Sequence, residues 1–151
     1  MQPYPHHYLV EAHAAATGHV ELGAKGLAPI ASAPPLEFGG PGDQWSPESL
    51  LVAAVVDCFV LTFRAIARAS KLEWTEIRCH AEGTLDRVER VTRFTKLRIV
   101  AELILPAGGG EDMALRLLEK AEQNCLVTNS LNVPIELQAR AVVTEQPSTK
   151  G

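Results

Sequence analysis

The chain has few cysteines, and none stands in a common metal-binding or disulfide spacing. Its 151 residues include three, Cys58, Cys79 and Cys125, with no CxxC or CxxH arrangement. Such a sparse and odd number does not resemble the disulfide framework of a secreted protein. Without closely spaced cysteine and histidine pairs, a zinc site is not expected. We therefore expect no bound metal, and thiols that are reduced at rest.

The chain also has no excess of positive charge, no signal-peptide pattern in its first residues and no long uncharged apolar run. The formal charge is −4, which provides no overall attraction for nucleic acid. The first eight residues lack the basic-then-apolar pattern of a signal peptide. The longest apolar stretch, residues 50–63, is interrupted by Asp57 and is shorter than a bilayer span requires. These features predict a cytoplasmic protein without membrane or nucleic-acid partners.

What the chain does have is enough apolar residues for an ordinary core. Hydrophobic residues make up 46% of the 151 residues, and a chain of this length can fold without disulfides or a structural metal. We predict a single domain over residues 1–151, with flexible ends at residues 1–7 and 146–151.

Hydrophobic periodicity separates strand-like from helix-like segments. Alternation of apolar and polar residues predicts strands at residues 8–16, 20–24, 74–87, 97–105 and 135–143. Helices are predicted from Pro47 to about Ser70, after an N-cap at Ser46, and at residues 111–124. Because strands and helices are segregated along the chain, the predicted fold class is α+β rather than a doubly wound parallel sheet.

The first predicted helix is apolar on nearly every side between residues 50 and 63. A helix of that kind is expected to be buried on most sides. One small sheet offers too little apolar surface to cover it. We therefore expect a second copy of the chain to cover the rest in an intimate dimer.

Two thiols and a carboxylate are candidates for chemistry. Cys58 lies in the apolar helix directly after Asp57, and Cys125 lies at the predicted end of the second helix. A free cysteine is often only a small core hydrophobe, and this is what we expect of Cys79, on the apolar face of its strand. A reactive Cys58 needs a nearby cation or hydrogen-bond donor. Glu48 lies in the first turn of its helix, where the helix dipole alone would favour a carboxylate.

A specific combination of residues runs through the chain. Pro35-Leu36-Glu37-Phe38-Gly39-Gly40 leads into Trp45-Ser46-Pro47-Glu48-Ser49-Leu50-Leu51, Cys58 stands ten residues after Glu48, and Cys125-Leu126-Val127-Thr128-Asn129 follows far downstream. Over about residues 8–143 the chain resembles the OsmC/Ohr family, the osmotically inducible and organic hydroperoxide resistance proteins.

The resemblance implies an OsmC-like fold, with antiparallel sheets wrapped around a buried central helix in an intertwined homodimer. It implies a thiol peroxidase for organic hydroperoxides, in which Cys58 matches the peroxidatic cysteine and Cys125 the resolving one. Glu48 matches the glutamate that holds the family's active-site arginine. The implied reductant is an external dithiol such as a lipoylated protein, and no cofactor is implied.

The chain departs from the family at that arginine. In the peroxidases it follows an Ala-Thr-Gly-like turn, but here Ala16-Thr17-Gly18 is followed by His19. Lys25 is the only lysine or arginine before Arg64, so Lys25 or His19 would have to substitute, or an arginine from elsewhere must reach the site. A lysine offers a point charge and not a planar fork. A family-typical proline after the second cysteine is Leu126 here. The alternative function is a non-catalytic OsmC-like thiol protein that binds an apolar ligand or senses oxidants.

Two further expectations concern the shape of the site. Phe38, Trp45 and Phe59 are candidate walls for an apolar hydroperoxide, with ordinary core packing as the alternative. Glu48 and Cys58 are ten residues apart on one predicted helix, roughly 15 Å along its axis, so they cannot touch within it. If both serve one site, a side chain must bridge them, the helix must begin later, or the glutamate comes from the other subunit.

Overall fold

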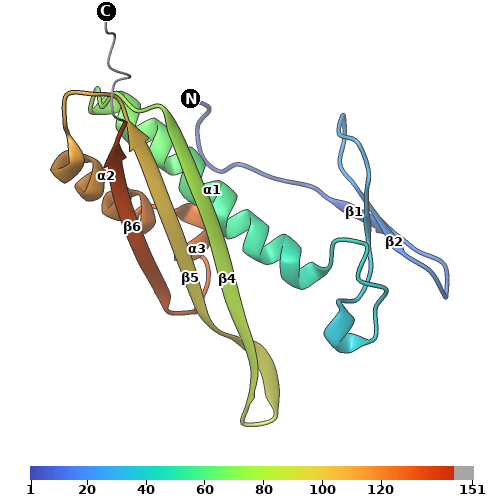
Figure 1. Cartoon of the computed structure of the whole chain (residues 1–151). Coiled ribbons are helices and arrows are strands. Elements are labelled where there is room, and N and C mark those ends of the chain that lie inside the picture. The colour runs from blue at the N-terminus through green and yellow to red at the C-terminus, as the bar shows by residue number, and fades with distance from the viewer. Residues whose placement is uncertain (145–151) are drawn as a thin grey trace, which may run out of the picture. The chain divides into compact units, whose positions relative to one another are not determined.

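The computed structural model describes residues 1–144, and the tail predicted at residues 146–151 lies outside the described residues. Contacts divide the chain into two compact units, an N-terminal unit (Met1–Leu51) and a C-terminal unit (Val52–Gly151). Each unit carries its own three-stranded sheet, and most of the elements are labelled in Figure 1. The predicted α+β class is confirmed.

The N-terminal unit is built on an antiparallel sheet whose three short strands follow chain order: β1 (Glu11–His13), β2 (Val20–Gly23) and β3 (Ile30–Ser32). The first two lie within predicted strands, whereas β3 falls in a segment with no predicted strand. A short 3-10 helix, η1 (Leu36–Phe38), follows and ends at Gly39. The φ of Gly39 is 84°, in the left-handed region that glycine tolerates best.

Helix α1 (Pro47–Ala69) begins at a reciprocal pair of hydrogen bonds between two serines. The Ser46 hydroxyl oxygen accepts from the backbone N–H of Ser49 at 3.1 Å, and the Ser49 hydroxyl oxygen accepts from the backbone N–H of Ser46 at 2.9 Å. This is a capping box with serine in place of the usual Glu or Gln. Pro47 suits the first helical position because no donor is needed there. The predicted start of the helix is confirmed.

The C-terminal unit carries the second sheet, ordered β4 (Glu76–Val88), β5 (Val91–Leu105) and β6 (Ile135–Val143). β4 and β5 form a long antiparallel hairpin, but β6 pairs with β5 in parallel. The prediction of antiparallel sheets is therefore wrong for this last pair. A parallel neighbour requires a crossover connection, which is provided here by helices α2 (Glu111–Gln123) and α3 (Leu126–Asn129).

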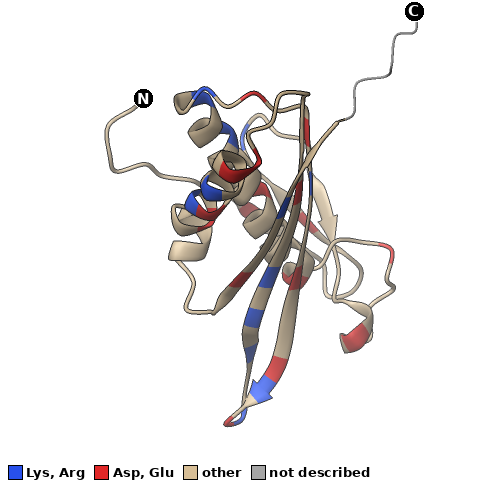
Figure 2. Cartoon of the chain, turned by 60° about the vertical axis from the view of Figure 1, so that its left-hand side comes forward, with Lys and Arg blue, Asp and Glu red and all other residues tan. Residues whose placement is uncertain are grey.

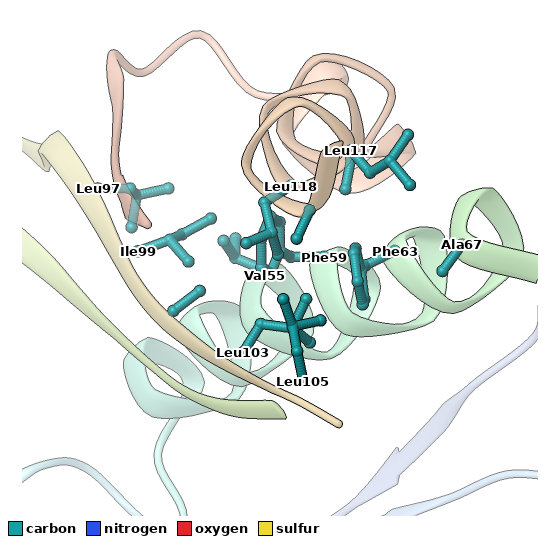
Figure 3. Packing of buried hydrophobic residues seen from close by; sticks show 13 residues of the cluster. Val55, Phe59, Phe63, Ala67, Leu97, Ile99, Leu103, Leu105, Leu117 and Leu118 are labelled. Atoms are coloured by element: carbon teal, nitrogen blue, oxygen red, sulfur yellow. The ribbon is translucent and has the colours of Figure 1, made fainter. Parts of the chain in front are cut away.

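One face of this second sheet and two helices enclose the core of the C-terminal unit (Figure 3). On β5 every second side chain from Leu97 to Leu105 is buried, as the predicted alternation requires. Helix α2 adds Leu118 and its neighbours. Helix α1 contributes a stripe at every fourth position: Val55, Phe59, Phe63 and Ala67. This spacing brings one face of α1 against the sheet.

The rest of α1 is less covered than its composition predicts. Leu61, between the buried Phe59 and Phe63, is 52% exposed, and Ala54 and Ala65 are exposed as well. The prediction of burial on most sides is not met within a single chain, because the fully buried residues of α1 are confined to the stripe. An apolar face of the helix therefore remains open to solvent.

Helix α1 is longer than the apolar stretch at residues 50–63, which by itself is too short for a bilayer span. Its 23 residues are long and apolar enough to cross a membrane by length and composition alone. The core helix of a soluble protein passes the same test. The stripe from Val55 to Ala67 lies in the hydrophobic core, so we interpret α1 as the core helix of a soluble protein.

The opposite face of the second sheet is polar and balanced in charge. Glu102 on β5 pairs with Arg78 on β4 and with Arg140 on β6, so opposite charges alternate across three strands. Lys96 pairs with Glu136 at 2.7 Å. Figure 2 shows lysine and arginine in blue and aspartate and glutamate in red, with bands of both colours along the strands. These charged side chains mark the solvated face of the sheet. Exposed ion pairs of this kind contribute little to stability.

Candidate active site

Cys58 lies on α1 beside the buried stripe and is partly exposed. Thr62 follows one helical turn later, and its hydroxyl oxygen is 3.8 Å from the Cys58 sulfur. Residues four apart share a face of a helix, so the helix itself places this hydroxyl beside the thiol. The thiol is therefore within reach of solvent and has a hydrogen-bond donor as a neighbour.

Cys125 stands between α2 and α3, as the N-cap residue of α3, with extended backbone angles (φ −69°, ψ 111°). Its side chain is fully buried. Its carbonyl accepts hydrogen bonds from the Thr128 hydroxyl at 3.1 Å and from the Asn129 backbone N–H at 3.0 Å. These bonds close the short helix α3 and hold Cys125 at its start.

The surroundings of Cys58 favour its ionised form. Burial raises the pKa of this thiol, but hydrogen bonds outweigh burial and lower the pKa below its ordinary value. The backbone N–H of Val127 and the Cys125 thiol have the larger effects, followed by the Thr62 hydroxyl and the backbone N–H of Leu126. A hydrogen bond donated to the charged form of a group stabilises that form. Cys58 is thus shifted towards the thiolate, the form that reacts.

Cys125 is shifted in the opposite direction. Burial raises its pKa, and the neighbouring Cys58 raises it further, although hydrogen bonds with Thr128 act against this. Burial on β4 raises the pKa of Cys79 to about 11. Cys58 is therefore the thiol whose surroundings most favour nucleophilic attack, and Cys79 fits the predicted role of a core residue.

The donors at Cys58 are neutral groups, whereas the family resemblance points to an arginine. Thr62 was predictable from the sequence alone, since a hydroxyl four residues after a helical cysteine shares its face. The N–H groups of Leu126 and Val127 were not, because only the fold brings α3 to this part of α1. Leu126 matters in one further respect. It retains a backbone N–H that a proline at this position would lack.

Glu48 belongs to the N-terminal unit and occupies the first turn of α1. With its neighbours it lines a mainly apolar hollow of about 250 Å³: Val20, Ser32, Ala33, Pro34, Pro35, Phe38 and Pro47. The Oε2 atom of Glu48 is buried and has no hydrogen-bond partner among the described residues. Because buried polar atoms are nearly always paired, this oxygen is expected to accept a hydrogen bond from a group that does not contact it in this structure.

The basic candidates are exposed and unattached to that carboxylate. His19 directly precedes β2, and Lys25 lies in the turn that follows β2. Within the described part of the chain, no ion pair joins either residue to Glu48. Helix α1 is unbroken from Pro47 to Ala69, which removes the alternative that the helix begins after Glu48. Which residue serves Glu48 stays a prediction.

The three aromatic candidates fall in different surroundings. Phe38 lines the hollow beside Glu48 and is 59% exposed, and Trp45 is 52% exposed. Phe59 is fully buried in the core, which favours the core alternative for this ring. Roles in substrate binding stay predictions for Phe38 and Trp45.

Among residues 1–144, no three His, Cys, Asp or Glu side chains are grouped so that they could hold a metal ion.

Comparisons with known proteins agree on one family. The OsmC-like protein family matches residues 40–139. A curated relative, the uncharacterized protein YmaD of Bacillus subtilis (strain 168), is 28% identical over 112 residues, which is 72% of this chain and 75% of that protein.

Solved structures share the fold over nearly their whole length. An organic hydroperoxide resistance protein OsmC from Legionella pneumophila is 26% identical, with a TM-score of 0.75, and the match covers 91% of this chain and 99% of that one. An organic hydroperoxide resistance protein from Elizabethkingia anophelis is 22% identical, with a TM-score of 0.77, over 93% of this chain and 99% of that one. At this lower identity the likeness shows the fold alone. With its matched segment and this shared fold, the chain belongs to the OsmC-like protein family, as its sequence motifs predict.

Proposed function

We propose that this protein is a thiol-dependent peroxidase that reduces organic hydroperoxides, with Cys58 as the nucleophile and Cys125 as the resolving thiol. The observation that carries the proposal is a pair of neighbouring thiols whose pKa values shift in opposite directions. The thiolate is the nucleophilic form of cysteine, so the lowered pKa suits Cys58 to the first attack. Membership of the OsmC-like family and the likeness to organic hydroperoxide resistance proteins support a peroxide-related stress role.

In the first half-reaction the Cys58 thiolate attacks the distal oxygen of the hydroperoxide. An S–O bond forms, the O–O bond breaks, and the sulfur is oxidised to a sulfenic acid. The leaving alkoxide takes up a proton and departs as the alcohol. Partial exposure of Cys58 gives the oxidant access to this sulfur.

In the second half-reaction the Cys125 sulfur attacks the sulfenic sulfur of Cys58. An S–S bond forms, the S–O bond breaks, and the oxygen leaves as water. Burial of Cys125 protects it from direct oxidation by solvent-borne peroxide. An external dithiol, such as a lipoylated protein, then reduces the disulfide by thiol exchange. The cytoplasm is the proposed compartment, because its reductants keep thiols reduced.

A hydroperoxide with an apolar tail is the proposed substrate class. Apolar pockets bind apolar ligands more tightly than small polar ones, so hydrogen peroxide should be a poorer substrate. Phe38 is the candidate for contact with the tail, because its ring lines the hollow that also holds Glu48. Trp45 is the second candidate.

A homodimer is the proposed working form. The exposed apolar surface of one chain includes Leu61 on α1 and, in the N-terminal unit, Tyr8, Leu9 and Leu36. Soluble monomers rarely expose large apolar patches. A second copy would cover this surface, and it would let Glu48 of one subunit serve the thiols of the other, whereas along one helix Glu48 and Cys58 are too far apart to touch.

Lys25 is the proposed source of the charge that the missing arginine supplies elsewhere in the family, with His19 as the other candidate. It is the only lysine or arginine in the first 63 residues, and the Glu48 carboxylate oxygen in the same unit has no partner among the described residues. Replacement of Lys25 by methionine keeps the length of the side chain and removes the charge. If Lys25 has this role, the variant turns over hydroperoxide more slowly and stays folded, whereas unchanged turnover removes Lys25 from the account.

The test of the proposed function is consumption of cumene hydroperoxide by the purified, reduced protein in the presence of dihydrolipoamide. The protein should consume it faster than hydrogen peroxide. Cys58→Ser should abolish turnover, Cys125→Ser should stop recycling, and Cys79→Ser serves as the matched control with turnover retained. If the parent protein consumes cumene hydroperoxide no faster than its Cys58→Ser variant, the proposed peroxidase function is wrong.

A non-catalytic thiol protein is the second candidate, and one observation favours it. No arginine occurs before Arg64, so the residue that activates the family's cysteine is absent from its usual place. Such a protein would bind an apolar ligand or be oxidised slowly at Cys58. It would form the disulfide once with excess hydroperoxide but show no sustained turnover with dihydrolipoamide.

A further inference from the structure

Thr62 is a polar exception in an apolar helix. Between residues 50 and 69 it is the only residue of α1 with a hydroxyl group. Packing does not require this hydroxyl, since valine has nearly the same shape, and threonine is not a favoured helix former. We therefore looked for a chemical role of the Thr62 hydroxyl.

The hydroxyl is directed at one atom. Its oxygen lies 3.8 Å from the Cys58 sulfur, and the pair is partly buried. A β-branched side chain has few rotamers in a helix, so Thr62 loses little freedom when it holds this position. The usual competing acceptor for a helical threonine is the carbonyl four residues earlier, which here also belongs to Cys58.

We propose that the Thr62 hydroxyl donates a hydrogen bond to the Cys58 thiolate and thereby sets the nucleophilicity of this sulfur. The inference rests on the proposed function for its catalytic meaning, because it assigns a further residue to the same site. Thr62 touches the reacting sulfur, and its donor carries no charge.

The direction of the hydrogen bond follows from the protonation state of the sulfur. When Cys58 is a thiol, either group can donate. When Cys58 is a thiolate, it can only accept, so the Thr62 hydroxyl must donate. A donor that is gained by the charged form favours that form, in agreement with the effect of Thr62 on the pKa of Cys58. Because the donor is neutral, its effect should depend little on ionic strength, unlike that of an exposed cation.

The experiment measures the rate of alkylation of Cys58 by iodoacetamide as a function of pH. Peptide mass spectrometry separates Cys58 from the other two thiols. Thr62→Val removes the hydroxyl at nearly constant volume, and Thr62→Ser keeps it. Thr62→Ala is a second hydroxyl-free variant that carries the test if the valine variant does not fold. Thr92→Val, at an exposed position of β5, is the matched control.

The valine and alanine variants should alkylate Cys58 at neutral pH roughly tenfold more slowly, the change for about one pKa unit, and their pH profiles should move to higher pH. Thr62→Ser should restore most of the parent rate. Parent-like profiles for the hydroxyl-free variants would overturn the inference, as would a serine variant as slow as the valine one. The titration uses no peroxide, so a shifted profile without peroxidase activity would remove the proposed function and leave the role of Thr62.

Discussion

Cys58 and Cys125 lie in the C-terminal unit, where each thiol shifts the pKa of the other, and they differ in access as well as in pKa. Cys58 is partly exposed and has a lowered pKa, whereas Cys125 is fully buried and has a raised one. An oxidant that arrives from solvent therefore meets the more ionised thiol first. The order of access agrees with the order of the two half-reactions proposed for these sulfurs.

The first prediction concerns pH. Because the thiolate is the nucleophile, alkylation accelerates as the pH rises through the pKa, and a lowered pKa moves that rise to lower pH. Cys58 should therefore react at lower pH than Cys125, and Cys79, with a pKa of about 11, should react last. Residue-resolved alkylation of the native protein measures this order. A Cys125 profile that lies at lower pH than that of Cys58 would reverse the assigned roles.

The second prediction is a reversible disulfide between Cys58 and Cys125. A disulfide requires Cα atoms within about 7 Å, and each of these thiols is near enough to shift the pKa of the other. Mass spectrometry of oxidised protein should find this pair, with Cys79 free. In Cys125→Ser, dimedone should trap the sulfenic acid on Cys58. An intramolecular disulfide through Cys79 as the main product would refute the pairing.

The sequence predicted the elements that depend on local pattern. The strict alternation from Leu97 to Leu105 marks the centre of β5, and the Ser46–Pro47 start of α1 is a local capping signal. Alternation of apolar residues likewise marks β6 at residues 135–143. These features are readable because each depends on residues close together in the chain.

Long-range arrangement was not readable in the same way. Nothing in the sequence of β6 distinguishes a parallel from an antiparallel neighbour, because its direction depends on the crossover through α2 and α3. The backbone donors of Leu126 and Val127 at Cys58 depend on the same crossover. Composition does not reveal them, since every non-proline residue carries an N–H. Among the donors at Cys58, the Thr62 hydroxyl was thus predictable from the sequence, and the two backbone N–H groups were not.

The third prediction is that α1 contributes to a homodimer interface. Leu61 on α1 is 52% exposed, so a charge there should be costly if a second copy covers it. Leu61→Glu should shift the protein from dimer towards monomer in sedimentation at low micromolar concentration. Val91→Glu, on the 57% exposed Val91 of β5, is the control. If the parent protein sediments as a well-folded monomer under these conditions, the prediction of a homodimer is wrong.

The fourth prediction separates two aromatic rings. Phe59 is fully buried, so Phe59→Ala should lower the free energy of unfolding by about 3–5 kcal/mol. Phe38 is 59% exposed, so Phe38→Ala should change stability little and raise the KM for cumene hydroperoxide more than that for hydrogen peroxide. Urea unfolding and steady-state kinetics measure the two effects. Equal effects of Phe38→Ala on both KM values would remove this ring from substrate binding.

The most direct test of the central claim, that Cys58 reduces organic hydroperoxides, is a single turnover without any reductant. Fully reduced protein is mixed with a stoichiometric amount of cumene hydroperoxide, and the alcohol product and the free thiols are followed together. Cumyl alcohol should form in proportion to the protein while the thiols of Cys58 and Cys125 disappear, and Cys58→Ser should form none above background. Alcohol formation that is no faster in the parent than in Cys58→Ser would contradict it.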